Sequence, residues 1–181
     1  MRTGRLNKMR KNVYSPALLR GAHASRPFRD WGLHAPSGQR KYLTPHERRR
    51  FIAAARRQPP SLQTFCLTLA YTGCRLSEAL ALTAGDIEIE DGLVSIRCLK
   101  KRGRLVVRQV PVPPAFLQLL ERMHSDAFRP EALTRRLWRW RRTRAWQLVK
   151  EVMRAAQIYQ TAASPKGLRH TFGTHAILSG V

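Results

Sequence analysis

Apolar positions in the first half of the chain recur with the period of a helix and are interrupted at two breaks. In YLTPHERRRFIAAARRQ, Thr44 is a helix N-cap, Pro45 the first helical residue and Glu47 the partner that closes a capping box. The proline pair at 59–60 ends this helix. A second helix in SLQTFCLTLAYTG stops at Gly73, and a third is predicted in CRLSEALALT.

After the third helix the apolar period changes from helical to alternating. Ile87 and Ile89 alternate with acids, Asp91 and Gly92 mark a turn, and valines alternate again after Gly103. This predicts a small antiparallel sheet with a polar, basic hairpin tip in LKKRGR.

Helical spacing returns at Pro113 with PAFLQLLERMH, followed by a turn near Pro130 and a helix through LTRRLWRWRRTRAWQLVKEVMRAAQI. Five residues are expected to form the apolar, core-facing side of its later half: Trp146, Val149, Val152, Met153 and Ala156. Helices, a small sheet and helices again predict a mainly α domain of the α+β class.

Charge adds a function class to this fold. The 181 residues carry 34 Lys and Arg against 11 Asp and Glu, a net charge of +23, and only seven of the 34 are lysines. Arginine binds phosphate in a bidentate manner, so the composition favours nucleic acid as the partner. The alternative is a basic composition without a nucleic-acid role.

Other classes are disfavoured by composition. The three cysteines are scattered, which predicts neither a zinc site nor a disulfide framework and favours a reducing, cytoplasmic compartment. No apolar run reaches membrane-spanning length, and a secretory signal is not expected because the first residues lack an apolar stretch. Residues 1–41 are basic and rich in proline and glycine, and are expected to form a flexible arm, either phosphate-tracking or inert. The folded domain is expected over 42–181.

Three short stretches carry candidate chemistry. Arg75 and Glu78 lie three apart on a short helix, so the carboxylate can orient the guanidinium. Lys100 and Lys101 lie at the hairpin tip, either reaching into a site or simply solvated. In SPKGLRHTFGTHAILSGV, Ser164 caps a helix whose first turns hold two cations, which oppose the helix dipole unless they share an anion.

These three stretches together resemble the tyrosine recombinase (phage integrase) family. TGCRLSEALALTAGDI is similar to the first arginine box, IRCLKKRGRLVVRQVPVP to the hairpin with the catalytic lysine, and SPKGLRHTFGTHAILSGV to the second arginine box. The resemblance implies catalytic roles for Arg75, Lys100, Lys166 and Arg169, with Glu78 orienting Arg75.

The resemblance also implies a mechanism. Members attack a DNA phosphodiester with a tyrosine, without metal or cofactor, and form a 3′-phosphotyrosyl intermediate. The two arginines would stabilise the transition state, the hairpin lysine (Lys100, or Lys101 if the hairpin is longer) would protonate the leaving oxygen, and Lys166 stands where most members have histidine. Double-stranded DNA is the implied partner, bound by a tetramer on two duplexes at the nucleoid. Further DNA contacts are expected from Lys101, Arg102, Arg104, Arg139, Arg141, Arg142, Arg144 and His170.

The nucleophile is the main departure from the family pattern. All four tyrosines precede Arg169, whereas the family's nucleophile follows the second box. The sequence is therefore expected to be a catalytic domain truncated before its tyrosine, and unable by itself to form a covalent adduct. The alternative is a non-catalytic, DNA-binding remnant of an integrase.

Overall fold

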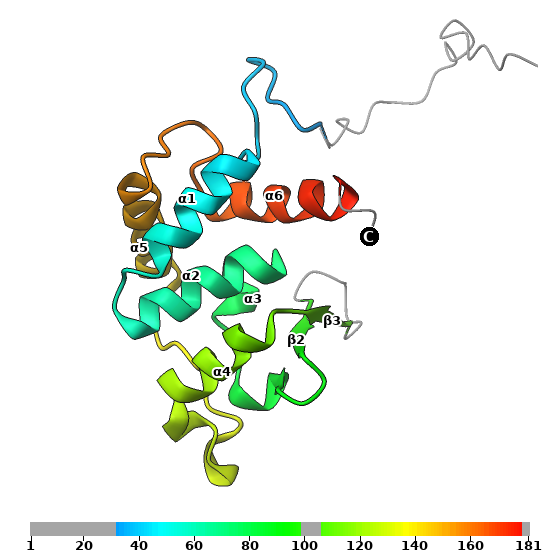
Figure 1. Ribbon diagram of the computed structural model, residues 1–181, viewed down its shortest axis with the longest axis vertical. Coiled ribbons are helices and arrows are strands. Elements are labelled where there is room, and N and C mark those ends of the chain that lie inside the picture. The colour runs from blue at the N-terminus through cyan, green and yellow to red at the C-terminus, as the bar shows by residue number, and fades with distance from the viewer. Residues whose placement is uncertain (1–31, 99–105, 179–181) are drawn as a thin grey trace, which may run out of the picture. The chain divides into compact units, whose positions relative to one another are not determined.

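A computed structural model describes residues 32–98 and 106–178 (Figure 1). Residues 1–31 of the expected arm, and the hairpin tip with Lys100, Lys101, Arg102 and Arg104, lie outside the described residues. The residues from Gly32 onward form one unit by their contacts.

Helix α1 (Pro45–Ala55) begins as the sequence predicts. The backbone N–H of Glu47 donates to Thr44 Oγ1 at 3.2 Å, and the N–H of Thr44 donates to Glu47 Oε2 at 2.7 Å. Such a capping box stabilises a helix start by about 1 kcal/mol. Phe51 and Ala55 are fully buried on the inner face of the helix.

Helix α2 (Pro60–Thr72) is buried on almost every side, because it contacts α1, α4 and α6. Three threonines lie within this apolar surrounding, and each hydroxyl donates to the carbonyl four residues earlier. Thr64 bonds to Pro60 O, Thr68 to Thr64 O and Thr72 to Thr68 O, at 2.7–2.9 Å. Buried hydroxyls are thereby satisfied inside the helix that carries them.

The sheet has the order β1-β2-β3 and is antiparallel throughout, as predicted. It comprises β1 (Ile87–Glu88), β2 (Leu93–Arg97) and β3 (Val107–Pro111). Val94 and Ile96 of β2 are fully buried, and Val110 of β3, which pairs with Val94, is 4% exposed. One face of the sheet therefore belongs to the core.

Helices α4 (Pro114–Met123) and α5 (Arg142–Ala155) follow the sheet, separated by 3₁₀ turns at Ser125–Ala127 and Pro130–Ala132. The predicted helix from residue 133 was wrong in its first third, because residues 133–141 are not helical. Trp138 explains this difference: its Nε1 donates to Ser61 O at 2.9 Å and its ring meets the Phe65 ring edge-on. Tertiary contacts thus override local helical spacing.

Trp146 was expected to face the core, and this expectation was also wrong. Its exposed fraction is 46%, whereas its neighbour Ala145 is fully buried. Helix α5 turns Ala145, Val149 and Val152 inward, which leaves Trp146 on the outer side.

Helix α6 (Pro165–Leu178) packs against α1 and α2 (Figure 1). Ser164 caps it as predicted, since its Oγ accepts from the N–H of Gly167 at 3.1 Å. The buried Thr171 hydroxyl accepts from the N–H of Leu43 at 2.7 Å and ties α6 to the entrance of α1. No helix in the described ranges is long and apolar enough to cross a membrane.

Candidate functional site

The turn after α2 places the first site residue. Gly73 adopts a left-handed conformation, with φ of 57°, and ends α2. Arg75 follows in extended backbone and is the N-cap of the short helix α3 (Leu76–Ala79). A glycine is needed at this sharp reversal because other residues adopt this φ only at a cost.

Glu78 is the buried centre of the site. Its side chain is 1% exposed. It accepts a hydrogen bond from the backbone N–H of Arg75 at 2.8 Å and a second from Arg75 Nη1 at 2.5 Å. The pair predicted from i, i+3 spacing is therefore formed, and the carboxylate fixes both ends of the arginine.

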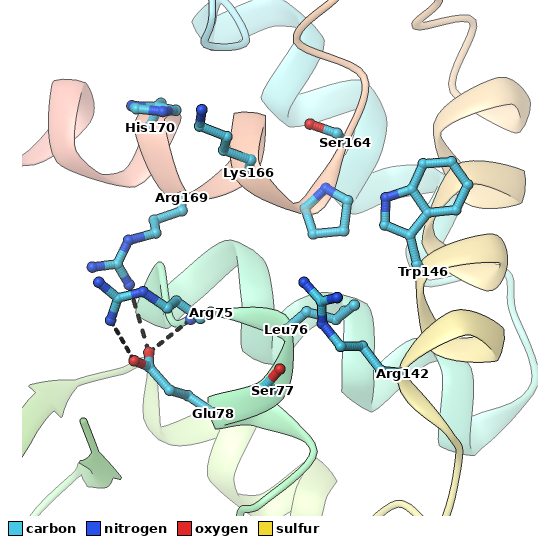
Figure 2. Close-up of a pocket in the computed structure, with 11 residues that line it drawn as sticks. Arg75, Leu76, Ser77, Glu78, Arg142, Trp146, Ser164, Lys166, Arg169 and His170 are labelled. Carbon is cyan, nitrogen blue, oxygen red and sulfur yellow. Dashed lines mark hydrogen bonds and ion pairs between the residues drawn. The ribbon is translucent and has the colours of Figure 1, made fainter. Parts of the chain in front are cut away.

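Arg169 reaches the same carboxylate from α6. Its Nη1 donates to Gly73 O at 2.9 Å and lies 3.6 Å from Glu78 Oε2. Figure 2 shows the Arg75 and Arg169 side chains converging beside Glu78. Two residues that are 94 positions apart in the sequence are thus brought together.

Cations exceed anions at this point. Burial alone would raise the pKa of Glu78, but hydrogen bonds from Arg75 and the charges of Arg75 and Arg169 bring that pKa below its usual value. Burial, followed by the charge of Arg75, lowers the pKa of Arg169. Arginine stays protonated despite such a shift, so the site holds two guanidinium groups against one carboxylate.

A cleft of about 750 Å³ opens between α3, α5 and α6 (Figure 2). Arg75, Glu78 and Arg169 line one part of it, and Arg142 and Trp146 of α5 line another. The side chains of Arg75 and Arg169 are 37% and 35% exposed, so both remain accessible to a ligand. The arrangement suits an anion, such as a phosphate, with an aromatic surface nearby.

Lys166 and His170 also line the cleft, on the first turns of α6. In Figure 2 both side chains point away from Glu78, unlike Arg169. Burial is the main cause that lowers the pKa of His170, and the positive charges of Lys166, Lys41 and Arg169 add to it. His170 is therefore held toward its neutral form among cations.

The other predicted DNA contacts are distributed unevenly. Arg142 lines the cleft, whereas Arg139, Arg141 and Arg144 are exposed and do not line it. Trp146 was missed as a cleft residue because its spacing suggested a core position. Among the described residues no group of three His, Cys, Asp or Glu side chains could hold a metal ion.

The chain is a mainly helical α+β domain in which two arginines meet one buried glutamate, and comparison with known proteins gives its family. Residues 41–181 match the phage integrase family. The chain is 32% identical over 124 residues to the tyrosine recombinase XerD of Mycobacterium leprae, covering 63% of this chain and 39% of that protein. It is also 32% identical over 126 residues to XerD of Neisseria meningitidis, covering 64% and 41%.

Solved structures share the fold. The XerA recombinase gives a TM-score of 0.63 at 22% identity, covering 77% of this chain and 52% of that chain. The XerH recombinase bound to palindromic difH substrate gives 0.60 at 17% identity, covering 77% and 42%. The chain belongs to the phage integrase family of tyrosine recombinases, and it spans about two fifths of the length of the XerD relatives.

Proposed function

We propose that the cleft binds a phosphodiester of double-stranded DNA between Arg75 and Arg169. The observation that carries this proposal is the convergence of two guanidinium groups, from α3 and α6, on one carboxylate that cannot neutralise both. XerH, whose structure shares this fold, was solved bound to difH substrate, and the Tn1549 integrase with transposon right-end DNA.

The proposed chemistry is that of a site-specific recombinase. Arg75 and Arg169 stabilise the charge that develops on the non-bridging oxygens, and Glu78 orients Arg75. Lys166 assists either by donating a hydrogen bond to the phosphate or by accepting a proton. Lys100, outside the described residues, protonates the 5′-oxygen that leaves when a tyrosine bonds to the phosphorus and forms the 3′-phosphotyrosyl link. Tyr42, Tyr71 and Tyr159 are described, and none of them lines the cleft. The chemistry proposed for the cleft residues Arg75, Arg169 and Lys166 is therefore the binding and activation of the phosphate.

The outer side of α5 and the segment before it extend the proposed DNA surface. Arg139, Arg141, Arg142 and Arg144 lie exposed along this stretch, next to the exposed ring of Trp146. Exposed arginines contact phosphates and an exposed aromatic ring can pack against sugar or base. Further parts of this proposal are a phosphate-tracking role for the N-terminal arm, association with the nucleoid and assembly on two duplexes.

The test is the salt dependence of duplex binding by the full 181-residue chain. Each phosphate contact contributes about −0.9 to the slope of log Kobs against log salt. Arg75→Lys should weaken binding to a labelled duplex but keep most of the slope, because the charge remains without the planar fork. Arg169→Ala should weaken binding and reduce the slope by about 0.9.

Arg122→Ala is the matched control. Arg122 is exposed on α4, which in Figure 1 lies on the other side of α2 from α6, and it is not a cleft residue. If Arg75→Lys changed affinity, and Arg169→Ala changed affinity and slope, no more than Arg122→Ala does, the cleft would not be the phosphate site. Thermal unfolding of each variant separates lost binding from lost folding.

A further inference from the structure

Arg108 is a charged residue on the core-facing side of the sheet. It lies on β3 and pairs directly with Ile96 of β2, which is fully buried. Residues that pair across antiparallel strands point to the same face, and Val110, two positions on, is also buried. The side chain of Arg108 therefore starts from the face that packs on the rest of the domain.

The guanidinium of Arg108 has no partner for two of its nitrogens. Nε and Nη2 are buried and make no hydrogen bond within the described part of the chain. Other arginines near the site differ: Arg97 of β2 lies 3.1 Å from Asp86, and Arg75 is paired with Glu78. A buried N–H without an acceptor is costly, and a buried charge more so.

Arg108 does not itself line the cleft, but its charge is felt by residues of the proposed site. Its charge acts on Arg169 and on Cys74, the buried residue between Gly73 and Arg75. Burial raises the pKa of the Cys74 thiol to about 11, and the charges of Arg108 and Arg169 oppose that rise. Glu78 is paired with Arg75 and Arg169 only, so Arg108 adds a third positive charge to this region without a carboxylate of its own.

We propose that Arg108 is a third phosphate-binding arginine, which donates from its unpaired nitrogens to the same DNA phosphodiester that Arg75 and Arg169 hold. This inference rests on the proposed function, and it adds a residue from β3 to a site otherwise built from α3 and α6. A bound phosphate supplies the acceptors that Arg108 lacks and neutralises the excess charge.

A structural role would be filled better by an apolar residue. Methionine replaces the aliphatic stem of arginine with an apolar one and buries no charge, so it avoids the desolvation cost. An arginine kept here at the expense of stability is expected where binding requires it. The two roles therefore predict opposite effects of Arg108→Met on the DNA-free protein.

The experiment compares Arg108→Met and Arg108→Lys with the parent chain, with Arg122→Met as the control for losing one exposed charge. Duplex binding is measured across a salt series, and Tm is measured without DNA. Arg108→Met should raise Tm or leave it unchanged, lower duplex affinity about tenfold and reduce the salt slope by about 0.9. Arg108→Lys should restore the slope in part, because the charge returns without the planar fork.

Two results would overturn the inference. One is a slope and affinity for Arg108→Met equal to those of Arg122→Met. The other is a fall in Tm for Arg108→Met together with unchanged binding, which would make Arg108 structural. If Arg169→Ala reduces the slope but Arg108→Met does not, only this inference fails. If neither reduces it, the proposed function fails first.

Discussion

Replacing Glu78 by glutamine tests the centre of the site. The substitution keeps the size of the side chain and one carbonyl oxygen but removes the negative charge that Arg75 and Arg169 share. One hydrogen bond from Arg75 can persist on the remaining oxygen, whereas the two guanidinium groups lose the anion between them. The DNA-free protein should therefore become less stable.

The size of the loss follows from burial and distance. A hydrogen bond to a charged group contributes about 1.5–3 kcal/mol. Glu78 is 1% exposed, but the side chains of Arg75 and Arg169 are 37% and 35% exposed, so water compensates part of the lost attraction. At 3.6 Å the contact with Arg169 is also weaker than that with Arg75. We expect a loss of about 2 kcal/mol, or about 4–8 °C in Tm for a domain of this size.

Urea unfolding of the full chain, followed by far-ultraviolet circular dichroism, measures this loss. Glu151→Gln on α5 is the matched control, because Glu151 is 49% exposed and lies 3.7 Å from Arg144. That exposed pair should contribute no more than about 0.5 kcal/mol. A Glu78→Gln variant as stable as the Glu151→Gln variant would refute the account of Glu78 as the residue that holds the two arginines together.

Three further changes test the surrounding structure. A hydrogen bond from Arg40 lowers the pKa of Glu47 to about 2, so its stabilising effect is complete above the usual value of 4.5 and lost as pH falls toward 2; Glu47→Gln should flatten the stability curve in that range, as urea unfolding at each pH would show. Gly167→Ala would place a Cβ 1.8 Å from Ala162 O, and should cost more than about 2 kcal/mol in urea unfolding. Gly73→Ala combines a φ of 57° with a Cβ 2.6 Å from the Phe172 ring, and should lower both Tm and duplex affinity by displacing the carbonyl that Arg169 binds.

Local signals in the sequence predicted much of the fold. The capping box at Thr44, the break at Gly73 and the alternation that starts at Ile87 each involve residues within a few positions of one another. Such signals act through the backbone before any tertiary contact forms. The Arg75–Glu78 pair was predictable for the same reason, since both residues lie within one helical turn.

Tertiary contacts explain the two features that were predicted wrongly from the sequence, which are the start of α5 and the exposure of Trp146. Trp138 and Trp146 both lie in an arginine-rich stretch with mixed helical spacing. Trp138 is buried because it contacts Ser61 and Phe65, whereas Trp146 is exposed. The contact of Trp138 with Ser61 spans 77 positions and holds the segment before α5 out of the helix. With the helix starting at Arg142, the phase of α5 turns Trp146 into the cleft rim instead of the core.

The sequence indicates only in part that Arg108 is a candidate site residue, and the three-dimensional structure is needed for the rest. The position of Arg108 two residues before Val110 marks it, by the period of a strand, as an inward-facing charge, but the sequence names no partner for it. In the structure, Arg108 pairs with Ile96 across the sheet, and its charge acts on Arg169. The charged group near Arg108 is therefore another cation and not an acid. Burial lowers the pKa of Arg169 most, and the charges of Arg75 and Arg108 lower it further, which shows that these cations repel one another in the empty site. Binding an anion relieves that repulsion, so the free energy that destabilises the empty site becomes part of its affinity for phosphate.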